Sequence, residues 1–89
     1  MARADSAQVG IAQIAARFPE EAGRLQGLAA TDPDFRELCE EYGLARESLA
    51  RFEAMPDAVD RPEVPDYRAV IAELESEIGR FLTEARPGR

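Results

Sequence analysis

Hydrophobic residues recur every three or four positions through most of the chain, which is the spacing of helices with one buried side. Alanine, glutamate and leucine dominate and β-branched residues are few, so the composition also favours helix. Prolines interrupt the pattern, because a proline inside a helix removes a hydrogen bond and clashes with the preceding turn. The pattern predicts helices at about 6–17, 19–30, 33–54 and 66–86, with a connection at 55–65.

The third of these segments has the clearest start and the most regular apolar stripe. Asp32 can cap its first turn, and Pro33 fits the first helical position, where a backbone N–H is not needed. Its apolar residues then step by three and four, as in the contact seam of a coiled coil: Phe35, Leu38, Tyr42, Ala45, Leu49 and Phe52. The segment therefore predicts a helix that packs lengthwise against another helix.

The connection at 55–65 contains three prolines, so we expect it to be extended and not helical. Asp66 is predicted to cap the last helix, and Pro87-Gly88 is predicted to end it. The apolar stripe of this helix is wide and includes Leu74, Ile78 and Phe81, which indicates contact with more than one neighbour.

Two helices of about 20 residues, each about 30 Å long and joined by a short connection, most simply fold back on each other. The expected fold class is all-α, an antiparallel, coiled-coil-like helical hairpin. We place the hairpin domain at 18–86 and an N-terminal helical extension at 1–17. A bare hairpin leaves one flank of each seam in water, so we expect two copies to pair into a four-helix bundle, which is a homodimer.

The composition argues against several classes of function. The chain of 89 residues holds 11 Arg and 18 acidic residues, has a net charge of −7 and contains no His. Nucleic acid is an unsuitable partner, because its phosphates need a basic surface. With no His and with Cys39 as its only cysteine, the sequence offers no ordinary catalytic triad, zinc site or internal disulfide. We therefore expect no catalytic residues and no cofactor.

The compartment is predicted from the same sequence. The apolar stretch at 9–18 is too short to span a membrane and lacks the continuous apolar run of a secretory signal. A lone cysteine fits a reducing compartment. We expect a cytoplasmic protein.

Carboxylates cluster on the two long helices, at Glu37, Glu40 and Glu41 and at Glu73, Glu77 and Glu84. One hypothesis is a carboxylate metal site inside a bundle, but such sites also use His. The favoured interpretation is a solvated acidic face. Arginines at helical spacing are expected to pair with some of these groups, namely Arg36 with Glu40, Glu47 with Arg51, and Arg80 with Glu84.

Several segments resemble the YdcH-like family of small domains. They are Phe18-Pro-Glu-Glu, the series Asp32, Phe35, Leu38 and Tyr42, and Leu74-Glu-Ser-Glu77-Ile78. The resemblance covers about 18–82 and implies a helical hairpin that tends to associate, without implying a reaction. The family usually carries Lys in the last helix, where this chain has Glu73, Glu75 and Ser76. Apolar packing is therefore expected to contribute more to the pairing of the two helices.

Together these features predict a non-enzymatic protein-interaction module: a small acidic helical adaptor, regulator or accessory subunit. A basic protein partner is favoured, because opposite charge steers association. The interaction seam, within the hairpin or between two copies, is predicted at Phe35, Leu38, Tyr42, Leu49, Phe52, Leu74, Ile78 and Phe81.

The candidate partner contact is the N-terminal stripe of Ile11, Ile14 and Phe18. Three surfaces are alternatives for covering this stripe: the protein's own hairpin, which is favoured, the groove of a partner, and a membrane surface. The membrane is the least favoured of the three, because few positive charges flank the stripe.

Overall fold

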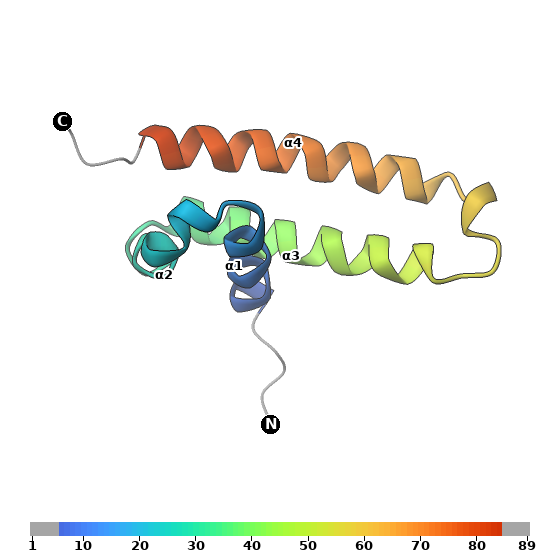
Figure 1. Ribbon diagram of the computed structural model, residues 1–89, viewed down its shortest axis with the longest axis horizontal. Helices are drawn as coiled ribbons and strands as arrows, with labels where there is room; N and C mark the ends of the chain where they lie inside the picture. The colour runs from blue at the N-terminus through green and yellow to red at the C-terminus, as the bar shows by residue number, and fades with distance from the viewer. Residues whose placement is uncertain (1–5, 85–89) are drawn as a thin grey trace, which may run out of the picture.

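The computed structural model describes residues 6–84, which form four α-helices and two 3-10 turns with no strand among them. The elements follow one another as α1 (Ser6–Arg17), η1 (Pro19–Glu21), α2 (Ala22–Thr31), α3 (Pro33–Glu53), η2 (Ala58–Asp60) and α4 (Glu63–Glu84). The expected all-α class is confirmed. Helices α3 and α4 lie side by side and run in opposite directions, and α1 and α2 pack on one half of this hairpin (Figure 1).

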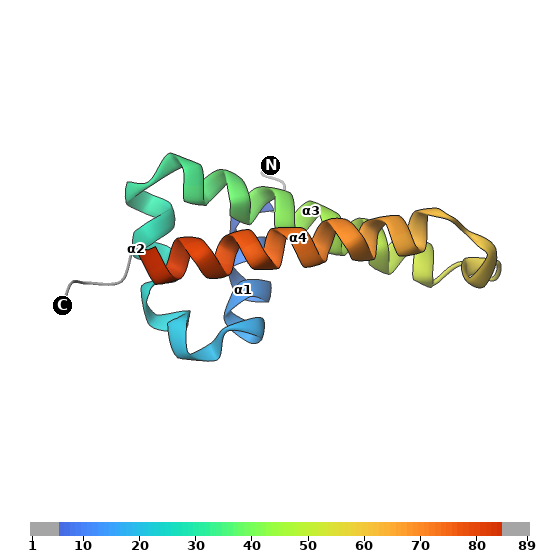
Figure 2. The same ribbon diagram turned by 90° about the horizontal axis from the view of Figure 1, so that it is seen from above.

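The far half of the hairpin extends beyond α1 and α2. Figure 2 shows α3, α4 and the turn between them continuing on one side of the molecule, where no other helix accompanies them. The molecule is accordingly long, with principal extents of 49 × 34 × 20 Å. One end of the hairpin is therefore built like a four-helix cluster, and the other end is only two helices wide.

The predicted start of α3 is confirmed. The Asp32 side chain accepts hydrogen bonds from the backbone N–H groups of Asp34 and Phe35, at 3.0 and 3.3 Å. Pro33 occupies the first helical position. This cap satisfies two of the N–H groups that a helix leaves without internal partners.

The connection differs from the prediction. Helix α4 begins at Glu63 and not at the expected Asp66, which lies in the first turn and is not its cap. Pro65 is tolerated there because the N–H of the third helical residue has no partner inside the helix. The expected extended connection also contains the 3-10 turn η2. The predicted end of this helix at 86, before Pro87-Gly88, lies outside the described residues.

The predicted helix at 19–30 is divided. Pro19–Glu21 forms a 3-10 turn, and α-helical geometry begins only at Ala22. In the turn, the N–H of Glu21 donates to the carbonyl of Phe18 at 2.9 Å, which is the tighter hydrogen bond of a 3-10 turn. Helix α2 therefore begins three residues later than predicted.

Of the predicted N-terminal helical extension at 1–17, residues 6–17 form α1 and share a core with the hairpin, and 1–5 lie outside the described residues. Gly10 of α1 lies directly on the backbone of α3. A Cβ on Gly10 would overlap the carbonyl oxygen of Cys39 and would lie 2.7 Å from its carbonyl carbon. The close crossing of these two helices therefore requires glycine at this position.

Arg24 connects α2 to the end of α4. Its Nη2 donates to the carbonyl oxygen of Leu82, and its Nε lies 2.6 Å from Oε1 of Glu21. A cation near the last carbonyls of a helix is stabilising, because those groups lack internal partners. This contact holds α2 against the hairpin.

Candidate functional site

The eight residues of the predicted seam lie on α3 and α4. Phe35, Tyr42, Leu74 and Ile78 are buried, and Leu38, Leu49, Phe52 and Phe81 are partly buried. Two aromatic pairs join the helices: Phe35 with Phe81, at a ring-centroid distance of 5.0 Å, and Phe52 with Tyr67, at 5.8 Å. These side chains therefore hold the hairpin itself together.

The structure places two of the three residues of the candidate partner contact in the protein's own core, which is the favoured alternative for the N-terminal stripe. Ile11 is 5% exposed and Ile14 is fully buried, and both belong to the core that includes α3 and α4. Phe18 is partly buried against the same core, with the Arg17 guanidinium 5.3 Å from its ring centroid. The stripe covers the protein's own hairpin, so neither a partner groove nor a membrane surface can reach Ile11 and Ile14 in this fold.

A polar contact that the sequence did not predict joins three helices. The Tyr42 hydroxyl of α3 donates to Oε2 of Glu75 in α4 at 2.7 Å, and Nε of Arg17 in α1 lies 3.5 Å from Oε1 of Glu75. Burial and the neighbouring Glu75 carboxylate raise the pKa of Tyr42 to about 12. Glu75, which the sequence marked as unfavourable for pairing of the two long helices, is therefore an acceptor that connects them.

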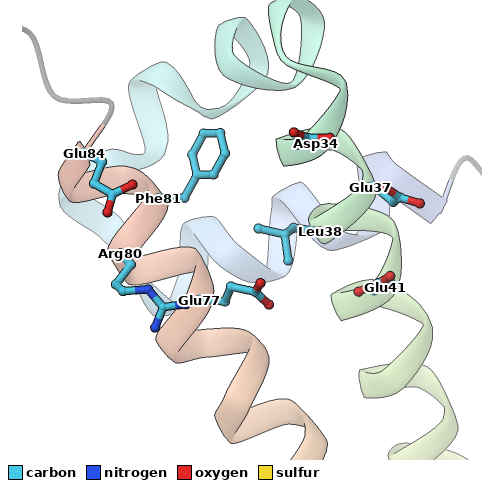
Figure 3. Close-up of a pocket in the computed structure, with 8 residues that line it drawn as sticks. All are labelled: Asp34, Glu37, Leu38, Glu41, Glu77, Arg80, Phe81 and Glu84. Carbon is cyan, nitrogen blue, oxygen red and sulfur yellow. The ribbon is translucent and has the colours of Figure 1, made fainter.

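Two hollows lie on the face of α3 and α4 that is opposite α1 and α2. We call the first the acidic groove. It has a volume of about 440 Å³ and is lined by Asp34, Glu37, Leu38 and Glu41 of α3 and by Glu77, Arg80, Phe81 and Glu84 of α4. Figure 3 shows Leu38, Phe81 and Glu77 directed toward the space between the two helices, with α1 and α2 behind it. Five carboxylates and one guanidinium thus surround an apolar floor.

The second hollow, which we call the apolar groove, continues along the same face. Its volume is about 320 Å³, and its lining is Glu41, Leu44, Ala45, Ser48, Tyr67, Val70 and Leu74. Glu41 lines both hollows, so they are adjacent along the hairpin. Leu44 and Val70, which both line this hollow, are 53% and 44% exposed. We refer to the two hollows together as the open face.

The carboxylates of the acidic groove have no ion-pair partner among residues 6–84. The predicted pairs Arg80 with Glu84 and Glu47 with Arg51 do not form there, whereas Arg36 and Glu40 approach to 3.9 Å. Exposed pairs at this spacing gain only a few tenths of a kcal/mol, so the side chains are not held together. Within the described residues, the groove therefore keeps most of its negative charge.

The carboxylate metal site is not supported. Within the described part of the chain, no group of three or more acidic or cysteine side chains is arranged to hold a metal ion. Cys39 is fully buried, and burial raises the pKa of its thiol to about 11. No helix in the described range is long and apolar enough to cross a membrane.

The sequence predicted that Glu37, Glu41, Glu77 and Glu84 lie on a solvated face, but it did not predict that they surround one groove. The sequence signal that could have indicated the groove was the helical spacing of these glutamates relative to Leu38 and Phe81, which are their neighbours on the same helices. The relative rotation of α3 and α4 decides whether two such stripes meet, and this cannot be obtained from either helix alone.

The chain matches no protein-family model, no curated protein and no solved structure. The resemblance to the YdcH-like family therefore stays a prediction from its sequence segments.

Proposed function

We propose that this chain is a non-enzymatic protein-interaction module, an acidic helical adaptor, regulator or accessory subunit, which binds its partner through the open face. The observation that carries the proposal is that Leu44 and Val70 stay half-exposed in the apolar groove, whose described lining residues all come from α3 and α4. Apolar side chains that stay half-exposed in one hollow gain free energy when a partner removes them from water, which supports binding at this face.

The chemistry of the side chains supports a binding role. Cys39 is buried and its thiol pKa is about 11, so very little of the nucleophilic thiolate exists at neutral pH. The sequence contains no His that could act as a general acid or base. The acidic groove is open to water and does not enclose a substrate-sized cavity away from solvent.

Two further expectations belong to this proposal. A buried, reduced cysteine is compatible with the cytoplasmic location expected from the sequence. The homodimer stays a prediction, and the open face is where a second copy would bind if it forms. Self-association is therefore the main outcome that competes with binding of a foreign partner.

The experiment places a photo-crosslinking amino acid on the open face in cells that normally make the protein. Val70→benzoylphenylalanine puts the probe in the apolar groove, and Val59→benzoylphenylalanine is the matched control, since Val59 is 92% exposed near the hairpin turn. We expect a discrete adduct with one foreign protein from position 70 and none from position 59. Adducts only with a second copy, or no adduct specific to position 70, would contradict the adaptor role.

A further inference from the structure

We infer that the occupant of the open face is a basic amphipathic helix of the partner, with its apolar stripe in the apolar groove and its Lys or Arg residues over the acidic groove. This inference rests on the proposed function, because it specifies the chemistry of the partner at the same face. Three features favour this occupant: the shape of the face, the position of its charges and the poor fit of a second copy.

The shape of the open face fits a helix. On α3 the lining positions follow one stripe along the helix: 34, 37, 38, 41, 44, 45 and 48. At 1.5 Å per residue this stripe is about 21 Å long, which a helix of about 14 residues would cover. A third helix can pack along the open seam between two antiparallel helices, as amphipathic helices do when they bind in hydrophobic grooves.

The charges differ between the two ends of the face. The acidic groove has five carboxylates against the one guanidinium of Arg80, and no ion pair within residues 6–84 neutralises them. Among residues 6–84, Glu41 is the only charged residue that lines the apolar groove. A neutral apolar helix over the acidic end would remove water from these carboxylates without giving them another hydrogen-bonding or charged partner, which is unfavourable. Lys or Arg side chains can cover the apolar floor of Leu38 and Phe81 while their charged ends meet the carboxylates.

A second copy of this chain fits the face less well. It would bring the same carboxylates and its own net charge of −7. In a two-fold pairing, each acidic groove would meet the partner copy's acidic groove or its apolar groove, whose lining contains no cation. Among the described lining residues, the only cation that either arrangement brings is Arg80 of the second copy, together with that copy's own five carboxylates, so a basic helix is the favoured occupant.

The test uses the full chain and two synthetic peptide helices of about 16 residues. Both have the same leucine stripe; one carries Lys at the polar positions near one end and the other carries Glu there. The groove variant Glu37→Gln/Glu41→Gln/Glu77→Gln removes three lining carboxylates. The matched control Glu20→Gln/Glu47→Gln/Asp60→Asn removes three exposed carboxylates elsewhere, so that both variants change the net charge from −7 to −4.

We expect the Lys peptide to bind the chain and the Glu peptide not to bind, as measured by fluorescence anisotropy. The groove variant should bind the Lys peptide about tenfold more weakly or worse, whereas the control variant should change its affinity by about twofold at most. Leu44→Gln should also weaken binding, and Val59→Gln should not, because only Leu44 lies in the groove. Circular dichroism checks that each variant is folded.

Equal weakening by the groove variant and the control variant would overturn the inference, because it would indicate attraction by net charge alone. Absence of Lys-peptide binding would also overturn it. If the crosslinking experiment meanwhile yields a foreign adduct at position 70, the interaction role stands and only the basic-helix occupant fails. If light scattering shows a dimer that Leu44→Gln dissociates, the occupant is a second copy and the inference is wrong.

Discussion

The Tyr42 hydroxyl donates a 2.7 Å hydrogen bond across the hairpin to the Glu75 carboxylate. The Tyr42 side chain is almost fully buried, with 1% exposure, so in the folded protein its hydroxyl donates to Glu75 and not to water. Arg17 approaches the other oxygen of Glu75, which brings α1 into the same contact. These three residues thus connect α1, α3 and α4, the helices whose packing positions the open face.

Replacing this hydroxyl should destabilise the fold. Tyr42→Phe keeps the ring but leaves Glu75 without its hydrogen bond, and we expect a loss of about 1 kcal/mol in the free energy of unfolding. Urea unfolding followed by circular dichroism measures it. The control is Tyr67→Phe, since the Tyr67 hydroxyl has no hydrogen bond among residues 6–84, and it should change stability much less. Equal effects of the two substitutions would contradict the role of the Tyr42 contact.

The same contact should make stability depend on pH in the alkaline range. Folding raises the pKa of Tyr42 from 10.0 to about 12, so the folded chain holds this proton more tightly than the unfolded chain. Its contribution is fully present below pH 10 and is lost as the pH rises toward 12. The stability difference between the wild type and Tyr42→Phe should therefore shrink over this range, measured by urea unfolding at a series of pH values. A constant difference would show that the proton is not held more tightly on folding.

Gly10 should be far less replaceable than Gly23 and Gly27 of α2. Gly10→Ala places a methyl group against the Cys39 backbone, which cannot move aside as a flexible side chain can, and we expect a loss of about 2–3 kcal/mol. At Gly23 and Gly27 an added methyl group would have nothing within 4 Å, so alanine at either should stabilise α2 by about 0.5–1 kcal/mol.

Thermal unfolding of these three variants tests the crossing of α1 and α3. Gly10→Ala should lower Tm, and Gly23→Ala and Gly27→Ala should raise it. A neutral or stabilising Gly10→Ala would mean that α1 does not lie on the Cys39 backbone as the structure has it.

The Cys39 thiol should be unreactive in the folded protein. The thiol is fully buried, so a reagent reaches it poorly, and its pKa is about 11, so little of the reactive thiolate is present. A disulfide reagent that releases a coloured thiol should report slow modification in buffer and rapid modification in denaturing urea. As the control, Ala50→Cys adds a thiol at an exposed position of α3, and this second thiol should react at once in the folded chain. Rapid modification of Cys39 itself under native conditions would show that the core opens readily.

Local patterns in the sequence determined the helices. Apolar spacing predicted α1 and α3 nearly to the residue, and Asp32-Pro33 predicted the start of α3, because capping involves only residues within one turn. The start of α4 was missed, since a proline at the third helical position is compatible with helix although proline-rich segments usually are not. Residue propensity alone does not distinguish a proline in the first turn of a helix from a proline in a non-helical connection.

The tertiary structure decided which surfaces each helix covers. An amphipathic stripe such as Ile11 and Ile14 shows that a face avoids water, but it does not show whether the protein itself or a partner covers it, because burial by either satisfies the same hydrophobic effect. The mutual rotation of α3 and α4 brings Tyr42 to Glu75. The same rotation places Glu41 and Glu77 in one groove. That rotation is set by the packing of all four helices at once, so no local segment contains it, and the open face exists only in the assembled fold.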